Sequence, residues 1–221
     1  MIRYTVHTVP GSPFARAVMA MLEEKGADWR LDPMAPGDHQ REPHLSRQPF
    51  GKMPALTWNG GCLYETQAIL RYLDELLPGP SFTPPKIDDR ARMNQAIGIC
   101  ENYLFPESAA VIAFQRVVGP KLMGLEPDEA AIAAAMPRSH TIFAELSNLL
   151  GDRPWFGGDR PSIADLMLGS HLEFFSRAPE WAELTAGRVN LVDWLERIEA
   201  RPAMQETLWE RLPERITLQT A

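Results

Sequence analysis

The stretch Gly51–Leu73, which reads GKMPALTWNGGCLYETQAILRYL, decides the fold of this chain. Pro54 stands just before the run 55–58, and Asn59-Gly60-Gly61 supplies turn residues that tolerate positive φ. An acid and a hydroxyl, Glu65-Thr66, then precede apolar residues at helical spacing: Ile69, Leu70 and Leu73. The stretch therefore predicts a strand, a tight turn, a second strand and a helix.

Upstream of this stretch the pattern predicts a strand, a helix and a further strand. Ile2, Tyr4 and Val6 alternate with polar residues, which is typical of a strand with one buried face. A helix should begin at Pro13 and stop before Gly26. A second strand is expected at Trp29-Arg30-Leu31, and an irregular, polar segment at residues 35–46. Periodicity alone leaves several small α/β arrangements open.

Downstream, successive prolines in residues 78–85 bar both helix and central strand, so they mark a linker. No strand pattern follows the linker. Apolar residues recur at helical spacing in four segments: residues 91–105, 128–150, 163–175 and 191–200. Pro137 should kink or split the second of these, and Gly151 should end it. We therefore expect an α/β domain at residues 1–77 and an all-helical domain at residues 86–221.

The composition excludes several classes of protein. Apolar residues make up 45% of the 221-residue chain and charged residues 23%, as in ordinary globular proteins. The net charge of −7, without clustered Lys and Arg, argues against a nucleic-acid partner. The longest apolar run, residues 130–136, is too short for a membrane span, and a cytoplasmic location is expected. Cys62 and Cys100 are interpreted as core thiols, and no metal site is expected.

Ser12 lies where the first strand turns into the first helix. A serine followed by proline is an ordinary helix N-cap, and that structural role is sufficient by itself. However, Ser12-Pro13-Phe14 with Arg16, followed by a helix ending Glu-Glu-Lys-Gly, resembles the catalytic turn of serine-type glutathione transferases. The resemblance covers the whole chain and mixes tau-like and phi-like motifs. It implies a thioredoxin-like domain followed by a helical bundle domain, with Ser12 donating a hydrogen bond to the sulfur of glutathione.

The same resemblance implies a set of glutathione-binding residues. A proline cannot donate to a strand ladder, so the main chain of Met53 is left free to pair with another peptide. In the family, the residue matching Met53 binds the cysteinyl residue of glutathione, beside a cis-proline matching Pro54. Glu65 and Thr66 would hold the γ-glutamyl end. The glycine carboxylate would be held by His39 and Lys52.

The resemblance also implies a function: conjugation of glutathione, as co-substrate, to a small hydrophobic electrophile by a homodimeric, detoxifying transferase. Candidate residues of the electrophile pocket are Phe14, Tyr103, Phe105 and Phe114, with Trp209 as a further aromatic candidate. Two rivals remain open. One is another glutathione-dependent reaction, such as dehalogenation, isomerisation, ether cleavage or disulfide reduction, and the other is a non-catalytic binding or scaffold protein.

Two further features of the sequence bear on folding and on the choice of donor. Ser162-Ile163-Ala164-Asp165 fits a helix capping box and should serve folding, and Arg16 is interpreted as structural. Thr8 is an alternative donor to the sulfur, whereas Tyr4 lies in mid-strand and upstream of the turn.

Overall fold

A computed structural model describes residues 3–213, which group into two compact units. The first unit is the chain up to Ser81 together with the residues from Arg201 on, and the second is Phe82–Ala200. From the proline-rich linker, we expected all residues from 86 on to belong to the helical domain. In the structure, the last described segment instead groups with the first unit.

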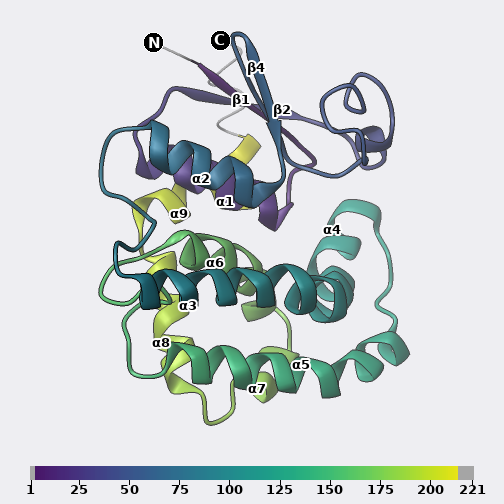
Figure 1. The fold of residues 1–221 in the computed structure, drawn as a ribbon. Helices are drawn as coiled ribbons and strands as arrows, with labels where there is room; N and C mark the ends of the chain where they lie inside the picture. Colours follow the sequence, from purple (N-terminus) through teal and green to yellow (C-terminus); the bar gives the residue numbers. More distant parts are fainter. Residues whose placement is uncertain (1–2, 214–221) are drawn as a thin grey trace. The chain divides into compact units, whose positions relative to one another are not determined.

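The first unit holds a four-stranded sheet with helices along one face (Figure 1). Its elements, in chain order, are β1 Tyr4–Thr8, α1 Pro13–Glu24, β2 Trp29–Pro33, η1 Asp38–Gln40, β3 Ala55–Trp58, β4 Gly61–Tyr64, α2 Thr66–Leu76, α9 Pro202–Glu206 and η3 Trp209–Arg211. The strands pair in the order β2-β1-β3-β4, with β1 parallel to β2 and the other pairs antiparallel. This mixed sheet is the predicted thioredoxin-like fold.

Strand β1 is buried along its whole length, although alternation predicted a single buried face. The polar residues are buried because neighbouring strands satisfy them. His7 Nδ1 lies 2.6 Å from Asp32 Oδ2, and its Nε2 lies 2.8 Å from Thr57 Oγ1. Thr5 Oγ1 accepts a bond from the guanidinium of Arg30. Ile2, which the same prediction included, lies outside the described residues.

Helix α1 is covered by the returning segment α9–η3. The side chain of Arg16 is buried, and its Nη2 donates to the carbonyl of Met204 at 2.9 Å. Arg201 forms an ion pair with Glu24 at the other end of the helix, with Nε to Oε1 at 2.6 Å. Arg16 therefore has the structural role that was predicted for it.

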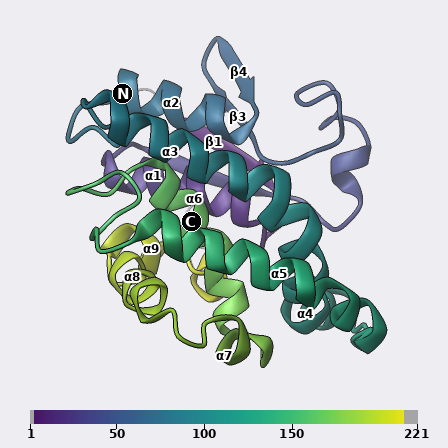
Figure 2. The same ribbon diagram turned by 60° about the horizontal axis from the view of Figure 1, so that its bottom comes forward.

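The second unit is all-helical among its described residues (Figure 2). Its elements are α3 Ile87–Ile99, the π-type helix η2 Cys100–Val118, α4 Gly119–Met123, α5 Glu129–Leu150, α6 Ile163–Ser176, α7 Glu180–Leu184 and α8 Val189–Glu199. Helix α6 is buried from Ile163 to Phe175 and packs against α3, η2 and α8. Helix α5 runs through Pro137 as one element and ends at Gly151, so the predicted split is wrong.

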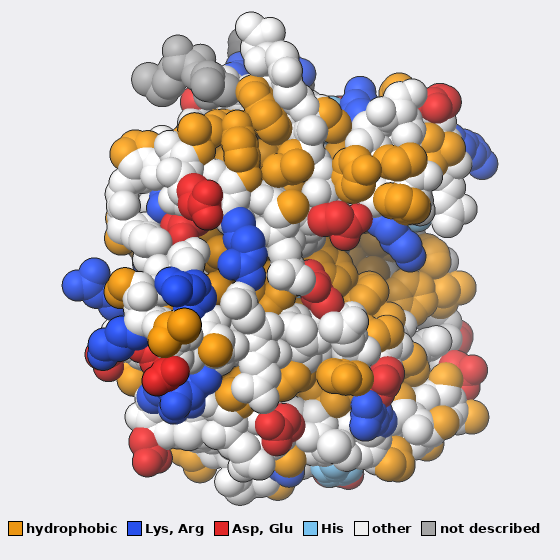
Figure 3. Space-filling model, in the orientation of Figure 1, with side chains coloured by type: hydrophobic (Ala, Val, Ile, Leu, Met, Phe, Trp, Pro, Cys, Tyr) orange, Lys and Arg blue, Asp and Glu red, His pale blue; other side chains and the backbone are white. Residues whose placement is uncertain are grey.

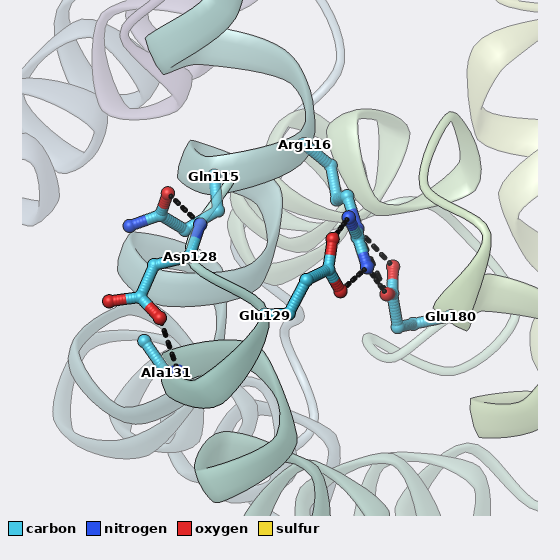
Figure 4. A network of polar contacts seen from close by, with 6 residues as sticks. All are labelled: Gln115, Arg116, Asp128, Glu129, Ala131 and Glu180. Atoms are coloured by element: carbon cyan, nitrogen blue, oxygen red, sulfur yellow. Dashed lines mark hydrogen bonds and ion pairs between the residues drawn. The ribbon is translucent and has the colours of Figure 1, made fainter. Parts of the chain in front are cut away.

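The start of α5 is fixed to the end of η2 by a polar network (Figure 4). Arg116 binds both oxygens of Glu129 and both oxygens of Glu180, at 2.5 to 3.2 Å. Asp128 caps α5 by accepting from the N–H of Ala131 at 3.0 Å. Hydrogen bonding to Arg116 holds the pKa of Glu129 below its usual value.

Within residues 3–213, no helix is both long enough and apolar enough to cross a bilayer. On the face drawn in Figure 3, the described Lys and Arg side chains are interspersed with Asp and Glu.

Candidate active site

Ser12 ends the turn between β1 and α1 and occupies the N-cap of α1. Its Oγ accepts a hydrogen bond from the N–H of Ala15 at 3.3 Å, and the residue is half-buried. Because Oγ acts as acceptor in the cap, its own proton stays available for donation to another group. Gly11 precedes it at φ 93°, with the ring of Trp209 against it, 3.2 Å from where a Cβ would stand. Ser12 can therefore cap α1 and donate its hydroxyl proton to another group at the same time.

The two other hydroxyls near this turn are less suited to donate. Thr8 is fully buried, and its Oγ1 already donates to the carbonyl of Val9 at 3.0 Å. Tyr4 begins β1 rather than lying in mid-strand as expected, at the end of the strand away from the turn, and burial raises the pKa of its phenol. Of these three hydroxyls, Ser12 is therefore the accessible donor.

The main chain of Met53 meets no partner within the described residues. None of the hydrogen bonds among residues 3–213 uses its N–H or its C=O, and the Met53-Pro54 peptide bond is cis. Its side chain reaches the turn of Ser12, because the N–H of Val9 donates to Met53 Sδ at 3.4 Å. The carbonyl of Val9 in turn accepts from the N–H of Ser12 at 3.3 Å. Val9 thus joins Met53 to Ser12.

The N-terminus of α2 carries no side-chain cap. Glu65, the residue before the helix, is exposed and has φ 68°, the one positive φ at a non-glycine among residues 3–213. Such a conformation costs about 1–3 kcal/mol and is commonly found at functional sites. Thr66 is buried, yet its hydroxyl bonds to no described residue. The helix start therefore offers uncapped N–H groups and a hydroxyl, which suit an anion.

His39 and Lys52 lie within electrostatic range of each other in the segment between β2 and β3. Burial, aided by His44 and Lys52, holds the pKa of His39 below its ordinary value, so its ring is neutral at pH 7. Its Nδ1 is buried without a partner in the described chain. Lys52 is exposed. A neutral donor and a cation are thus available on this segment.

Two residues on this segment, His44 and Gln48, were given no role from the sequence. Both are buried, with exposed fractions of 1%, and both bind the main chain of Lys52. A buried histidine and a buried glutamine in a segment that reads as a polar loop have no periodic signature. Their roles depend on contacts with the main chain of Lys52, which the sequence pattern does not show.

The predicted electrophile residues fall in both units. Phe14 lies in the first unit and is half-buried. On η2, Tyr103 lies under the guanidinium of Arg138 at 5.2 Å, Phe105 packs edge-on against His171, and the ring of Phe114 lies against Gly119. The other aromatic candidate, Trp209, packs on Gly11 in the first unit. The pocket itself stays a prediction.

The two cysteines differ from each other. Cys100 is buried as predicted, with Sγ 3.5 Å from His171 Nδ1, and burial raises the pKa of its thiol. Cys62 is exposed, so its assignment to the core is wrong: it lies on β4, an edge strand of the sheet. No group of three or more potential metal-binding side chains occurs within residues 3–213.

Known proteins resemble this chain over most of its length. Residues 6–81 match the family model for the glutathione S-transferase N-terminal domain, and residues 129–197 match the one for the C-terminal domain. Glutathione S-transferase hmp2 of Hypomyces subiculosus is 33% identical over 157 residues, which cover 69% of this chain and 73% of that protein. Glutathione S-transferase 4 of Zea mays is 29% identical over 87% of this chain and 86% of its own. Glutathione transferase F7 from Populus trichocarpa superposes with a TM-score of 0.81 at 26% identity, over 95% of this chain and 99% of its own.

Proposed function

The chain belongs to the glutathione S-transferase family and is a glutathione transferase, and we propose that Ser12 activates its glutathione for conjugation to a hydrophobic electrophile. The observation that carries the proposal is the pairing of Ser12 with Met53. A hydroxyl with an uncommitted proton and a main chain with uncommitted groups are linked through one residue, Val9.

The energetics of Ser12 are sufficient for this role. A free thiol titrates near pH 8.5, and lowering its pKa by about two units requires about 2.7 kcal/mol. A hydrogen bond to a charged group supplies roughly 1.5–3 kcal/mol. The N-terminus of α1 adds roughly 0.3–1 kcal/mol for an anion near it. The thiolate then dominates at neutral pH without a general base, and the serine itself never attacks.

The remaining proposed contacts hold the tripeptide. The main chain of Met53, beside Pro54, pairs with the cysteinyl residue. Thr66 and the uncapped start of α2 bind the α-carboxylate of the γ-glutamyl residue, and Glu65 meets its ammonium group. Lys52 supplies the charge for the glycine carboxylate, while His39, being neutral, supplies a hydrogen bond.

The electrophile is proposed to contact aromatic residues: Phe14, Tyr103, Phe105 and Phe114. We further propose that the protein works in the cytoplasm as a homodimer, without a metal. Light scattering of the purified protein measures the oligomeric state directly, since a homodimer has twice the mass of the 24.8 kDa chain.

A glutathione-affinity column run beside a conjugation assay with an activated aryl halide tests the function. Retention on the column with turnover is the expected result. Retention without turnover would favour a binding protein or a more specialised glutathione-dependent enzyme. Failure to bind glutathione under any condition would contradict the proposal.

A further inference from the structure

Lys52 has both of its main-chain groups bonded to buried side chains rather than to other main chain. Its carbonyl oxygen lies 2.7 Å from His44 Nε2, and its N–H donates to Gln48 Oε1 at 3.0 Å. Gln48 Oε1 also accepts from the N–H of Phe50 at 2.8 Å. The segment is therefore held by two side chains immediately before the residue that is proposed to bind glutathione.

The donor atom of His44 follows from its partner. A carbonyl can only accept, so Nε2 carries the proton and donates it to Lys52. The other ring nitrogen, Nδ1, is buried with no partner within residues 3–213. The backbone of His44 is itself fixed, since its carbonyl accepts from the N–H groups of Arg47 and Gln48 at 2.8 and 2.9 Å. The ring is thus a rigid donor.

The bond to Lys52 also orients Met53. The carbonyl of Lys52 and the N–H of Met53 belong to one planar peptide unit, which is trans in this structure. In a trans unit these two groups point in opposite directions. Anchoring the carbonyl on His44 therefore turns the N–H of Met53 away from His44, and that N–H has no partner in the described chain.

We propose that His44 is a positioning residue for glutathione. Its N–H fixes the Lys52–Met53 peptide plane, so the main chain of Met53 meets the cysteinyl backbone without first being ordered. This inference rests on the proposed function of Met53. A pre-ordered peptide affects binding of glutathione and leaves the ionised thiol unchanged, because the ring bonds to the carbonyl of that peptide unit, which points away from the N–H of Met53.

Two variants separate the hydrogen bond from the packing of the ring. His44→Phe keeps a ring of similar size and removes the donor, whereas His44→Gln removes the ring and keeps a donor. KM for glutathione should rise about tenfold in His44→Phe and stay within about threefold in His44→Gln. In both variants, kcat at saturating glutathione and the pH profile of kcat should match the wild type. His140→Phe is the matched control, since His140 bonds to Glu183 in the second unit.

Three results would overturn the inference: an unchanged KM in His44→Phe, an equal rise in both variants, or a fall in kcat alone. Should His44→Phe not accumulate as folded protein, His44→Gln decides by itself, because a tenfold rise in its KM contradicts a role for the donor. The wild type serves as the reference for the proposed function. If it binds no glutathione, the proposed function fails; if it binds and the variants bind equally well, only the positioning role fails.

Discussion

The starts of α6 and α1 are both capped by a serine, yet they differ in how fully their polar groups are satisfied. At α6, Ser162 and Asp165 are fully buried. The carboxylate accepts four hydrogen bonds of 2.7 to 2.9 Å, from the N–H and hydroxyl of Ser162, the N–H of Phe156 and the indole of Trp194. The predicted capping box is confirmed.

The start of α1 has a single bond of 3.3 Å, and the start of α2 has no side-chain cap. A helix start whose polar groups are all hydrogen-bonded within the protein stabilises the fold and leaves no donor for a ligand. A helix start without a side-chain cap is less stable by about 1 kcal/mol, but its N–H groups remain available to bind an anion. The contrast separates residues that serve folding from residues proposed to serve chemistry.

Of the substitutions considered, Asp165→Ala should have the largest effect, which is a loss of stability. Four buried donors lose their acceptor, so the free energy of unfolding should fall by about 4 kcal/mol. Denaturant unfolding measures this change, and KM for glutathione of the folded fraction should not move. Asp159→Ala, at an exposed position in the loop before α6, is the control. An unchanged melting temperature for Asp165→Ala would contradict the structural role.

Ser12→Ala should lower kcat/KM at about pH 6.5 roughly 30-fold, because about 2 kcal/mol of thiolate stabilisation is lost. Steady-state conjugation kinetics measure the loss. Asp128→Ala removes the corresponding cap of α5 and should cost stability without affecting turnover. Equal losses of activity in the two variants would show that Ser12 acts only as a cap.

Thr66→Val should raise KM for glutathione about fivefold while stability stays close to that of the wild type. The replacement has the same shape, and the hydroxyl it removes bonds to no described residue. Thr207→Val provides the opposite case, since that hydroxyl donates to the carbonyl of Ala203 at 2.8 Å. It should destabilise the fold and leave KM alone. An unchanged KM in Thr66→Val would remove Thr66 from the site.

Arg116→Gln should have the smallest effect, a slight fall in melting temperature that shrinks with added salt. Its partner Glu129 has a folded pKa below the ordinary value of 4.5. The stabilisation is therefore complete above about pH 5 and is lost as the pH falls through the lower, folded pKa. Thermal melts from about pH 3 to 7 should show the wild type and the variant converging in acid. A difference that persists in acid would assign Arg116 another role.

Local signals explain why so much of the fold could be predicted. Pro54, the turn at Gly60 and the capping box at Ser162 act within a few residues, and each lies where it was expected. The proposed site residues Ser12 and Thr66 were singled out for the same reason, because turns and helix starts have local sequence signals.

Most of the failures depend on contacts that no local pattern of residue types shows. The burial of His7 depends on Asp32 and Thr57, which alternation within one strand cannot reveal. The exposure of Cys62 depends on β4 lying at the sheet edge, and the roles of His44 and Gln48 depend on contacts with Lys52. Pro137 removes one helical hydrogen bond from a 22-residue helix whose ends are well capped, and the helix tolerates it.

Titration of bound glutathione tests the central claim most directly. The ultraviolet absorbance of the thiolate, followed against pH in the binary complex, gives the pKa of the sulfur without any electrophile. The wild-type complex should titrate about two units below the free thiol, and the Ser12→Ala complex about 1.5 units above the wild type, because the N-terminus of α1 still favours the anion. The same low pKa in both complexes would show that Ser12 does not hold the sulfur.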